Sequence, residues 1–126
     1  MELTCVTVDC ASPEKLVRFW SEALGWEIQH SGTDGAYCKP LTGGPGLEFI
    51  PVPESKTTKN RLHLGTRHDD LDTEIRRLIG LGARVAWEEE FPSEIAATYR
   101  NVVLRDPEGN EFCLSGGDPG SSYSSG

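Results

Sequence analysis

The feature that most constrains this chain is an internal repeat of 57 residues. One apolar helical pattern ends at Leu24-Gly25, and a second ends at Leu81-Gly82. A β-branched segment precedes each helix at nearly the same offset, and three short strand candidates follow each helix. Self-similarity at a fixed spacing indicates that one structural unit is used twice. The sequence therefore predicts an α+β fold of two βαβββ modules in tandem.

The first half contains recognisable start and stop signals. Residues 3–10 are rich in β-branched types and are typical of a strand. Ser12 is a predicted N-cap, Pro13 the first helical residue, and Gly25 the stop. Three further strands are predicted at 26–30, 36–39 and 47–52.

The same pattern restarts after a polar, proline-containing linker at 51–60. A strand is predicted at 61–67, and Asp69-Asp70 precede a second helix. The predicted inner face of that helix holds Leu71, Ile75, Leu78, Ile79 and Gly82. Strands are predicted at 84–87, 100–105 and 111–115. We expect one domain over 1–115, with module one at 3–54 and module two at 60–115, followed by a flexible Gly/Ser-rich tail at 116–126.

Composition narrows the class of protein. A chain of 126 residues can bury one ordinary core. A formal charge of −8 argues against nucleic acid as a partner, because phosphate binding uses clustered Lys and Arg. No apolar run approaches the roughly 20 residues that span a bilayer, and the N-terminus lacks a signal peptide, so we expect no membrane partner and a cytoplasmic protein. Four cysteines without a CxxC pair are expected to be free thiols.

Strand alternation separates each predicted sheet into two faces. Successive residues of a strand point to opposite sides, so one row is apolar and should carry the helices. The apolar row comprises Val6, Val8, Leu47, Phe49, Leu62, Leu64, Phe112 and Leu114. The opposite row carries Cys5, Glu48, His63, Glu111 and Cys113. A simple exposed face would be dominated by Lys, Glu and Thr, so this second row predicts a concavity lined for a small molecule.

His63, Glu48 and Glu111 are the predicted catalytic residues. A histidine can act as a general base or orient a ligand near neutral pH, and two carboxylates beside it suffice for proton transfer. Alternatives stay open for two of them. His63 could be a hydrogen-bonded core histidine, and Glu111 could instead hold the turn at Gly109-Asn110.

Several motifs together resemble the glyoxalase/bleomycin-resistance/extradiol-dioxygenase superfamily, also called vicinal oxygen chelate proteins. The sharpest is Asp106-Pro107-Glu108-Gly109-Asn110-Glu111-Phe112-Cys113. The others are Val8-Asp9-Cys10-Ala11-Ser12-Pro13, Phe19-Trp20, Leu24-Gly25-Trp26, Asn60-Arg61-Leu62-His63-Leu64 and Asp69-Asp70-Leu71-Asp72. The amino-acid sequences of these motifs are most similar to those of small bacterial glyoxalase-like proteins. The resemblance implies two modules whose sheets wrap around a shared site with the helices outside, often in a homodimer.

The resemblance also implies a ligand set. Metal-using relatives place ligands on the first and fourth strands of each module, and here those positions hold Cys5, Glu48, His63 and Cys113. Glu48 and His63 agree with the usual residue types, whereas Cys5 and Cys113 stand where His, Gln or Glu is common. Thiolate, imidazole and carboxylate suit zinc and suit Mg²⁺ or Mn²⁺ poorly. The alternative is that both cysteines only line the cavity and no metal binds.

Three functions stay open at this point. The first is lyase or isomerase chemistry, by acid/base or metal-assisted proton transfer, on a small polar metabolite, with His63 and Glu48 central. The second is a binding protein that sequesters a small molecule, as bleomycin-resistance relatives do. The third is an interaction module with an occluded cup. The polar inward row favours the first.

Overall fold

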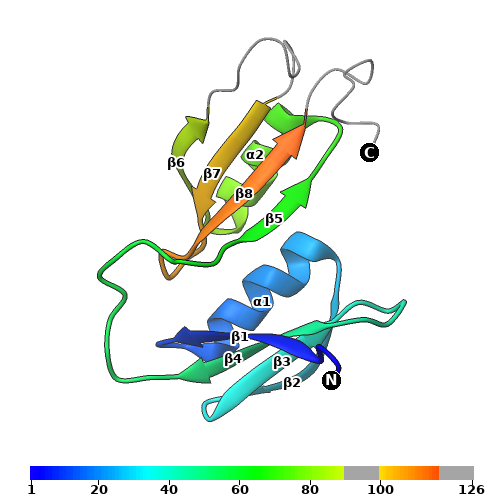
Figure 1. The fold of residues 1–126 in the computed structure, drawn as a ribbon, viewed down its shortest axis with the longest axis vertical. Coiled ribbons are helices and arrows are strands. Elements are labelled where there is room, and N and C mark those ends of the chain that lie inside the picture. Colours follow the sequence, from blue (N-terminus) through cyan, green and yellow to red (C-terminus); the bar gives the residue numbers. More distant parts are fainter. Residues whose placement is uncertain (90–99, 117–126) are drawn as a thin grey trace. The chain divides into compact units, whose positions relative to one another are not determined.

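Two compact units make up the chain. The computed structural model describes residues 1–89 and 100–116. Contacts divide the chain into unit 1, Met1–Thr57, and unit 2, Thr58–Gly126. Each unit has one four-stranded mixed sheet and one helix (Figure 1), which confirms the predicted pair of βαβββ modules. Of the predicted tail, Gly116 ends a strand and 117–126 lie outside the described residues.

Unit 1 has its parallel strand pair at one edge of the sheet. The strand order is β1-β4-β3-β2, in which β1 and β4 run parallel and the other neighbours run antiparallel. Its elements are β1 (Cys5–Cys10), α1 (Pro13–Leu24), β2 (Glu27–Gly32), β3 (Gly35–Lys39) and β4 (Gly46–Pro51). The first and last strands of the unit are therefore neighbours.

Helix α1 covers one face of this sheet and contacts β2, β3 and β4 (Figure 1). Its sheet-facing side chains include Leu16 and Val17, which are fully buried. The Phe19 and Trp20 rings pack edge to face with centroids 5.2 Å apart. The helix ends as predicted at Gly25, whose φ of 69° is a left-handed conformation that glycine adopts without steric cost. Apolar burial is thus what holds α1 on the sheet.

Unit 2 repeats this topology. Its strand order is β5-β8-β7-β6, again with a parallel pair, β5 and β8, at one edge. Its elements are β5 (Leu64–Arg67), α2 (Leu71–Leu81), β6 (Arg84–Glu89), β7 (Arg100–Arg105) and β8 (Glu111–Gly116). The two sheets even share one irregularity, because a β-bulge interrupts the register between Ile28 and His30 in β2 and between Val85 and Trp87 in β6.

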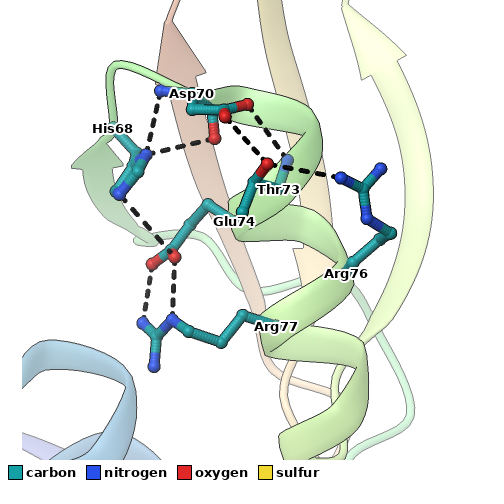
Figure 2. Close-up of polar contacts among 6 residues, drawn as sticks. All are labelled: His68, Asp70, Thr73, Glu74, Arg76 and Arg77. Carbon is teal, nitrogen blue, oxygen red and sulfur yellow. Dashed lines mark hydrogen bonds and ion pairs between the residues drawn. The ribbon is translucent and has the colours of Figure 1, made fainter.

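Polar contacts define the start of α2 (Figure 2). The Asp70 carboxylate accepts hydrogen bonds from the backbone N–H of Thr73 at 3.2 Å and from its hydroxyl at 2.8 Å, which makes Asp70 the N-cap. Glu74 accepts two hydrogen bonds from Arg77, at 2.8 and 2.7 Å, and lies 3.8 Å from His68 Nε2. By contrast, Ser12 at the start of α1 makes no side-chain capping bond.

Two predictions about unit 2 are wrong in detail. Ile79, predicted on the inner face of α2, is 49% exposed. The residues that this helix buries are Leu71 and Leu78, so its apolar contact is narrower than predicted. The strand predicted from residue 61 begins at Leu64, where pairing with Phe112 of β8 begins. Leu62 is accordingly exposed rather than part of the apolar row. None of the helices among the described residues is long and apolar enough to cross a membrane.

Candidate functional site

Each sheet has a face opposite to its own helix, here called the helix-free face. In unit 1, strand pairing aligns one residue from each strand across this face, because directly paired residues point to the same side. The row consists of Thr7, Glu48, Tyr37 and His30, from β1, β4, β3 and β2. Leu47 and Phe49, which flank Glu48 in β4, are buried on the helix side. The alternation predicted for this strand is therefore present.

Glu48 is held in place by one neighbour. The Thr7 hydroxyl donates a hydrogen bond of 2.9 Å to Glu48 Oε1, and the Cys5 thiol lies 3.9 Å from the same hydroxyl oxygen. Among residues 1–89 and 100–116, the second carboxylate oxygen of Glu48 has no hydrogen-bond or ion-pair partner. A half-buried carboxylate with one oxygen fixed and the other unoccupied can accept a proton or hold a cation.

Tyr37 lies beside this carboxylate. It pairs directly with Glu48 across β3 and β4, and its ring reaches over Gly46. A β-carbon added at Gly46 would stand 2.6 Å from the Tyr37 hydroxyl oxygen and 2.7 Å from ring carbon Cζ. The missing side chain at Gly46 thus makes the space that the phenol occupies.

The corresponding row of unit 2 is chemically different. It contains Gly65, Cys113, Val103 and Trp87, from β5, β8, β7 and β6. The Cys113 thiol is half-buried, and a β-carbon at Gly65 would lie 3.4 Å from its sulfur. The Arg105 guanidinium carbon lies 5.9 Å from the Trp87 ring centroid, within range of a cation–π contact. This row offers one thiol and an aromatic ring rather than a carboxylate.

Glu111 is buried and uses both carboxylate oxygens. Oε1 accepts a hydrogen bond of 2.9 Å from the backbone N–H of Asn60, and Oε2 pairs with Arg105 Nε at 3.3 Å. The Asn60 side chain also donates to Asn110 Oδ1 at 3.3 Å. These contacts tie the segment before β5 to the start of β8.

His63 belongs to that tied segment. It is exposed and immediately precedes β5 rather than lying within a strand. Within the described part of the chain, no hydrogen bond or ion pair engages its ring. The interpretation of His63 as a buried, hydrogen-bonded core histidine is therefore wrong.

The four predicted metal ligands divide equally between the units. Cys5 and Glu48 belong to unit 1, and His63 and Cys113 to unit 2. Among the described residues, no three His, Cys, Asp or Glu side chains are grouped so that they could hold a metal ion. The donor types nevertheless fit zinc, and Glu48 has an oxygen without a protein partner.

Several other titratable side chains are held by hydrogen bonds or by burial. Hydrogen bonds from Arg77 hold the pKa of Glu74 below its ordinary value, and hydrogen bonds from Arg100 do the same for Glu88. Arg100 also bonds Asp72 of α2 at 2.9 Å. Burial raises the pKa of the Cys38 thiol to about 11, against a backbone hydrogen bond from Leu47 that lowers it. These groups hold the fold together and are poorly suited to proton transfer near neutral pH.

Thr7 and Tyr37 were not among the predicted site residues. Threonine is common in strands, so the sequence alone does not single out Thr7. Its role in the site follows from its pairing with Glu48 and its hydrogen bond to that carboxylate. No sequence signal indicated Tyr37, because Gly46, over which its ring lies, precedes the strand predicted at 47–52.

The chain is similar to known proteins in sequence and in fold. The sequence profile of a family described as the glyoxalase-like domain matches residues 5–115. No curated protein matches the sequence significantly.

Solved structures resemble the chain over nearly its whole length. A glyoxalase/bleomycin resistance protein/dioxygenase family enzyme from Burkholderia phytofirmans PsJN is 17% identical with a TM-score of 0.73, covering 94% of this chain and 100% of that one. The fosfomycin resistance protein FosX from Listeria monocytogenes, solved with Mn(II) and sulfate, is 16% identical with a TM-score of 0.72, covering 93% and 90%. A glyoxalase family protein from Bacillus cereus is 16% identical with a TM-score of 0.68, covering 93% and 94%. At these identities the likeness concerns the fold.

Proposed function

Because this chain belongs to the family of glyoxalase-like domains, we propose that it catalyses proton transfer on a small polar metabolite, in a lyase or isomerase reaction, with Glu48 as the base. The single observation that carries the proposal is the state of the Glu48 carboxylate. Thr7 fixes one oxygen at 2.9 Å, and the other has no partner among the described residues. A positioned general base of this kind contributes about 10²- to 10⁴-fold to a rate.

The two other predicted catalytic residues receive different roles. His63 is exposed with no protein partner in the described chain, so its ring is available to exchange protons with a substrate. Glu111 has both oxygens engaged by Asn60 and Arg105. We assign Glu111 the positioning of the segment that carries His63, and its direct participation in catalysis stays a prediction.

A metal-assisted form of this reaction is part of the proposal. Cys5, Glu48, His63 and Cys113 would hold a divalent ion, with zinc favoured by the thiolates. Because four protein ligands fill the tetrahedral shell of zinc, such an ion would polarise a substrate oxygen as a Lewis acid only by taking that oxygen as a fifth ligand. The FosX structures solved with Mn(II) support metal use within this fold. They also mark a difference, because Mn(II) prefers oxygen-rich ligand shells, whereas two of the four groups here are thiols.

One observation favours the second candidate, a non-catalytic protein that binds and sequesters a small molecule. Trp87, Val103 and Gly65 give the row of unit 2 an aromatic ring, an apolar side chain and an open position. Binding sites are lined in this manner by apolar and aromatic groups with few polar ones. A homodimer in the cytoplasm stays a prediction for both candidates, and light scattering of the purified protein tests the dimer.

The test of the proposed function uses hydroxyacetone in D₂O, with exchange of its α-protons followed by ¹H NMR. Glu48→Gln keeps the Thr7 hydrogen bond and removes the base, so exchange should fall by at least 100-fold. Glu54→Gln, which alters an exposed linker carboxylate, is the matched control and should retain wild-type exchange. Equal exchange by wild type and Glu48→Gln would refute Glu48 as the base. Tight binding of hydroxyacetone without exchange would favour sequestration.

Elemental analysis of protein purified without a metal-affinity column tests the ion. Near-stoichiometric zinc that is lost in Cys113→Ala would support the four-residue shell. No metal after reconstitution would exclude it and leave a metal-free acid/base site.

A further inference from the structure

Tyr37 lies on the helix-free face of unit 1 and was not assigned to the site by the sequence analysis. It stands directly opposite Glu48 in the pairing of β3 with β4. Its ring does not extend straight out from the sheet but leans over Gly46, two residues before Glu48 in β4. Because Gly46 in turn pairs with Cys5 of β1, the phenol is directed from β3 across β4. The Tyr37 hydroxyl therefore lies on the same part of the helix-free face as Cys5, Thr7 and Glu48.

The Tyr37 hydroxyl has unused hydrogen-bonding capacity. Over residues 1–89 and 100–116, no side chain or backbone group bonds to it, although Tyr37 is half-buried. A phenol can donate one hydrogen bond and accept others. Tyrosine hydroxyls that are removed from bulk water usually find a partner. The absence of a side chain at Gly46 makes room for the phenol, and no described residue takes up the hydrogen bond that the phenol can donate.

We propose that Tyr37 is a further substrate-binding residue, whose hydroxyl donates a hydrogen bond to the substrate carbonyl oxygen, on the carbon next to the one that Glu48 deprotonates. This inference rests on the proposed function. Glu48 takes the proton of a C–H bond, and the electron pair of that bond forms a C=C bond. The carbonyl π pair moves to oxygen, where the Tyr37 hydroxyl stabilises the developing charge. In an α-hydroxy ketone, return of the proton from Glu48 to the former carbonyl carbon, together with movement of the α-hydroxyl proton to the former carbonyl oxygen, completes an isomerisation without net oxidation or reduction.

The geometry suits this division of roles. Glu48 Oε1 is fixed on the β1 side by Thr7, so the acidic and phenolic groups approach a ligand from different strands. A donor positioned before the reaction contributes more than one that must reorganise, because charge develops on the substrate oxygen only in the transition state. Removing one such donor from a water-excluded site lowers turnover by about 100- to 1,000-fold, and a half-buried donor such as Tyr37 should contribute less.

The test compares Tyr37→Phe with Ser31→Ala in the hydroxyacetone exchange assay. Tyr37→Phe removes only the hydroxyl, whereas Ser31→Ala removes a hydroxyl from the neighbouring strand on the opposite face. A Gly46→Ala variant is avoided, because its β-carbon would also meet the Cys38 carbonyl oxygen at 2.6 Å. We expect exchange to fall about 10- to 100-fold in Tyr37→Phe and to stay at the wild-type rate in Ser31→Ala. Equal exchange by Tyr37→Phe and wild type would overturn the role of Tyr37 while leaving Glu48 as the base.

A second measurement decides the case in which wild type shows no exchange. The chain has three tyrosines, so ¹³Cζ-tyrosine labelling with Tyr37→Phe as the reference identifies the Tyr37 signal. Movement of that signal on titration with hydroxyacetone would support the hydrogen bond, and the proton-transfer function alone would fail. An unchanged signal would overturn the role of Tyr37.

Discussion

The two units have the same backbone plan but carry different chemistry on their helix-free faces. In unit 1, Thr7 of the first strand pairs with Glu48 of the last, and in unit 2, Gly65 of the first strand pairs with Cys113 of the last. Thr7 therefore corresponds to Gly65, and Glu48 corresponds to Cys113. Two residues earlier in the last strand of each unit, Gly46 corresponds to Glu111. In unit 1 that position is empty and Tyr37 fills the space, whereas in unit 2 a buried carboxylate occupies it and binds Asn60 and Arg105. The repeat therefore fixes where side chains point, and each copy has its own set of functional groups.

The units also differ in how their helices are held. Helix α1 buries Pro13, Leu16, Val17, Phe19 and Trp20 and has no side-chain cap. Helix α2 buries only Leu71 and Leu78, but it has the Asp70 cap and an ion pair from Arg100 to Asp72. Apolar packing dominates in unit 1, and polar contacts supplement a smaller apolar contact in unit 2.

Truncating each helix core gives the largest expected effect. Leu16→Ala in α1 should lower the free energy of unfolding by about 2–5 kcal/mol, because it leaves a cavity in a fully buried position. Leu78→Ala in α2 should fall at the lower end of that range, since fewer buried side chains surround it. Urea unfolding of both variants against wild type measures the difference. A larger loss in Leu78→Ala would contradict the contrast between the helices.

Thiol reactivity separates the helix side of the unit 1 sheet from the helix-free faces of both sheets. Cys38 is fully buried on the helix side of unit 1, and burial raises its pKa to about 11. Cys5 and Cys113 are half-buried on the helix-free faces. Iodoacetamide at pH 8 should therefore modify Cys5 and Cys113 at least about 100-fold faster than Cys38, because the thiolate is the reactive form. Peptide mass spectrometry over time gives the rates, and early modification of Cys38 would show that the burial pattern is wrong.

Glu111 provides the next test, since its counterpart in unit 1 is a glycine. Glu111→Ala should lower the free energy of unfolding by about 1–3 kcal/mol, because the Asn60 N–H and Arg105 lose a buried acceptor. Glu111→Gln keeps an acceptor for Asn60 and should recover most of that loss. The NMR signals of His63 should broaden or move in Glu111→Ala and stay close to wild type in Glu111→Gln. Unchanged His63 signals in both would refute a positioning role.

Acid should weaken unit 2 before unit 1, with the smallest expected effect. Hydrogen bonds from Thr73, Arg77 and Arg100 hold the pKa values of Asp70, Glu74 and Glu88 below their ordinary range. A lowered pKa in the folded state adds stability that is present above the unfolded value of about 4 and is lost as pH falls through the folded pKa.

The exposed Arg100–Glu88 pair should account for about 1 kcal/mol or less of that acid effect. Two-dimensional NMR between pH 6 and pH 3 should show signals of α2 and β6 weakening first. Earlier loss of β1 and β4 signals would contradict this assignment of stability.

Much of the fold follows from sequence pattern, because its signals are local. Pro13 and Gly25 bound α1 as predicted, and Leu47 and Phe49 turn inward while Glu48 turns outward. The start of β5 could not be predicted in this way. Leu62 and Leu64 alternate with polar residues as a strand would, but the ladder begins only where β8 supplies a partner, and Glu111 binds the segment before it through Asn60.

The functional residues are harder to predict because they depend on pairing. Glu48 could be selected from its place on the polar row, whereas Tyr37 becomes meaningful only once its position over Gly46 is known. Side-chain roles of this kind arise between strands that are not adjacent in sequence, so a single sequence does not encode them in any local signal.

The parallel edge pair of each sheet has a consequence for synthesis on the ribosome. Every strand pair of unit 1 lies between Cys5 and Pro51, and the sheet closes only when β4 emerges to pair with β1. Until then β1 has no paired strand, because its one neighbour in the sheet, β4, lies about 40 residues further along the chain. Such non-local pairs form only after the intervening segment has been brought together. The nascent chain should therefore assemble the Glu48–Thr7 pair in one late step, while the β8 strand of unit 2 is still untranslated.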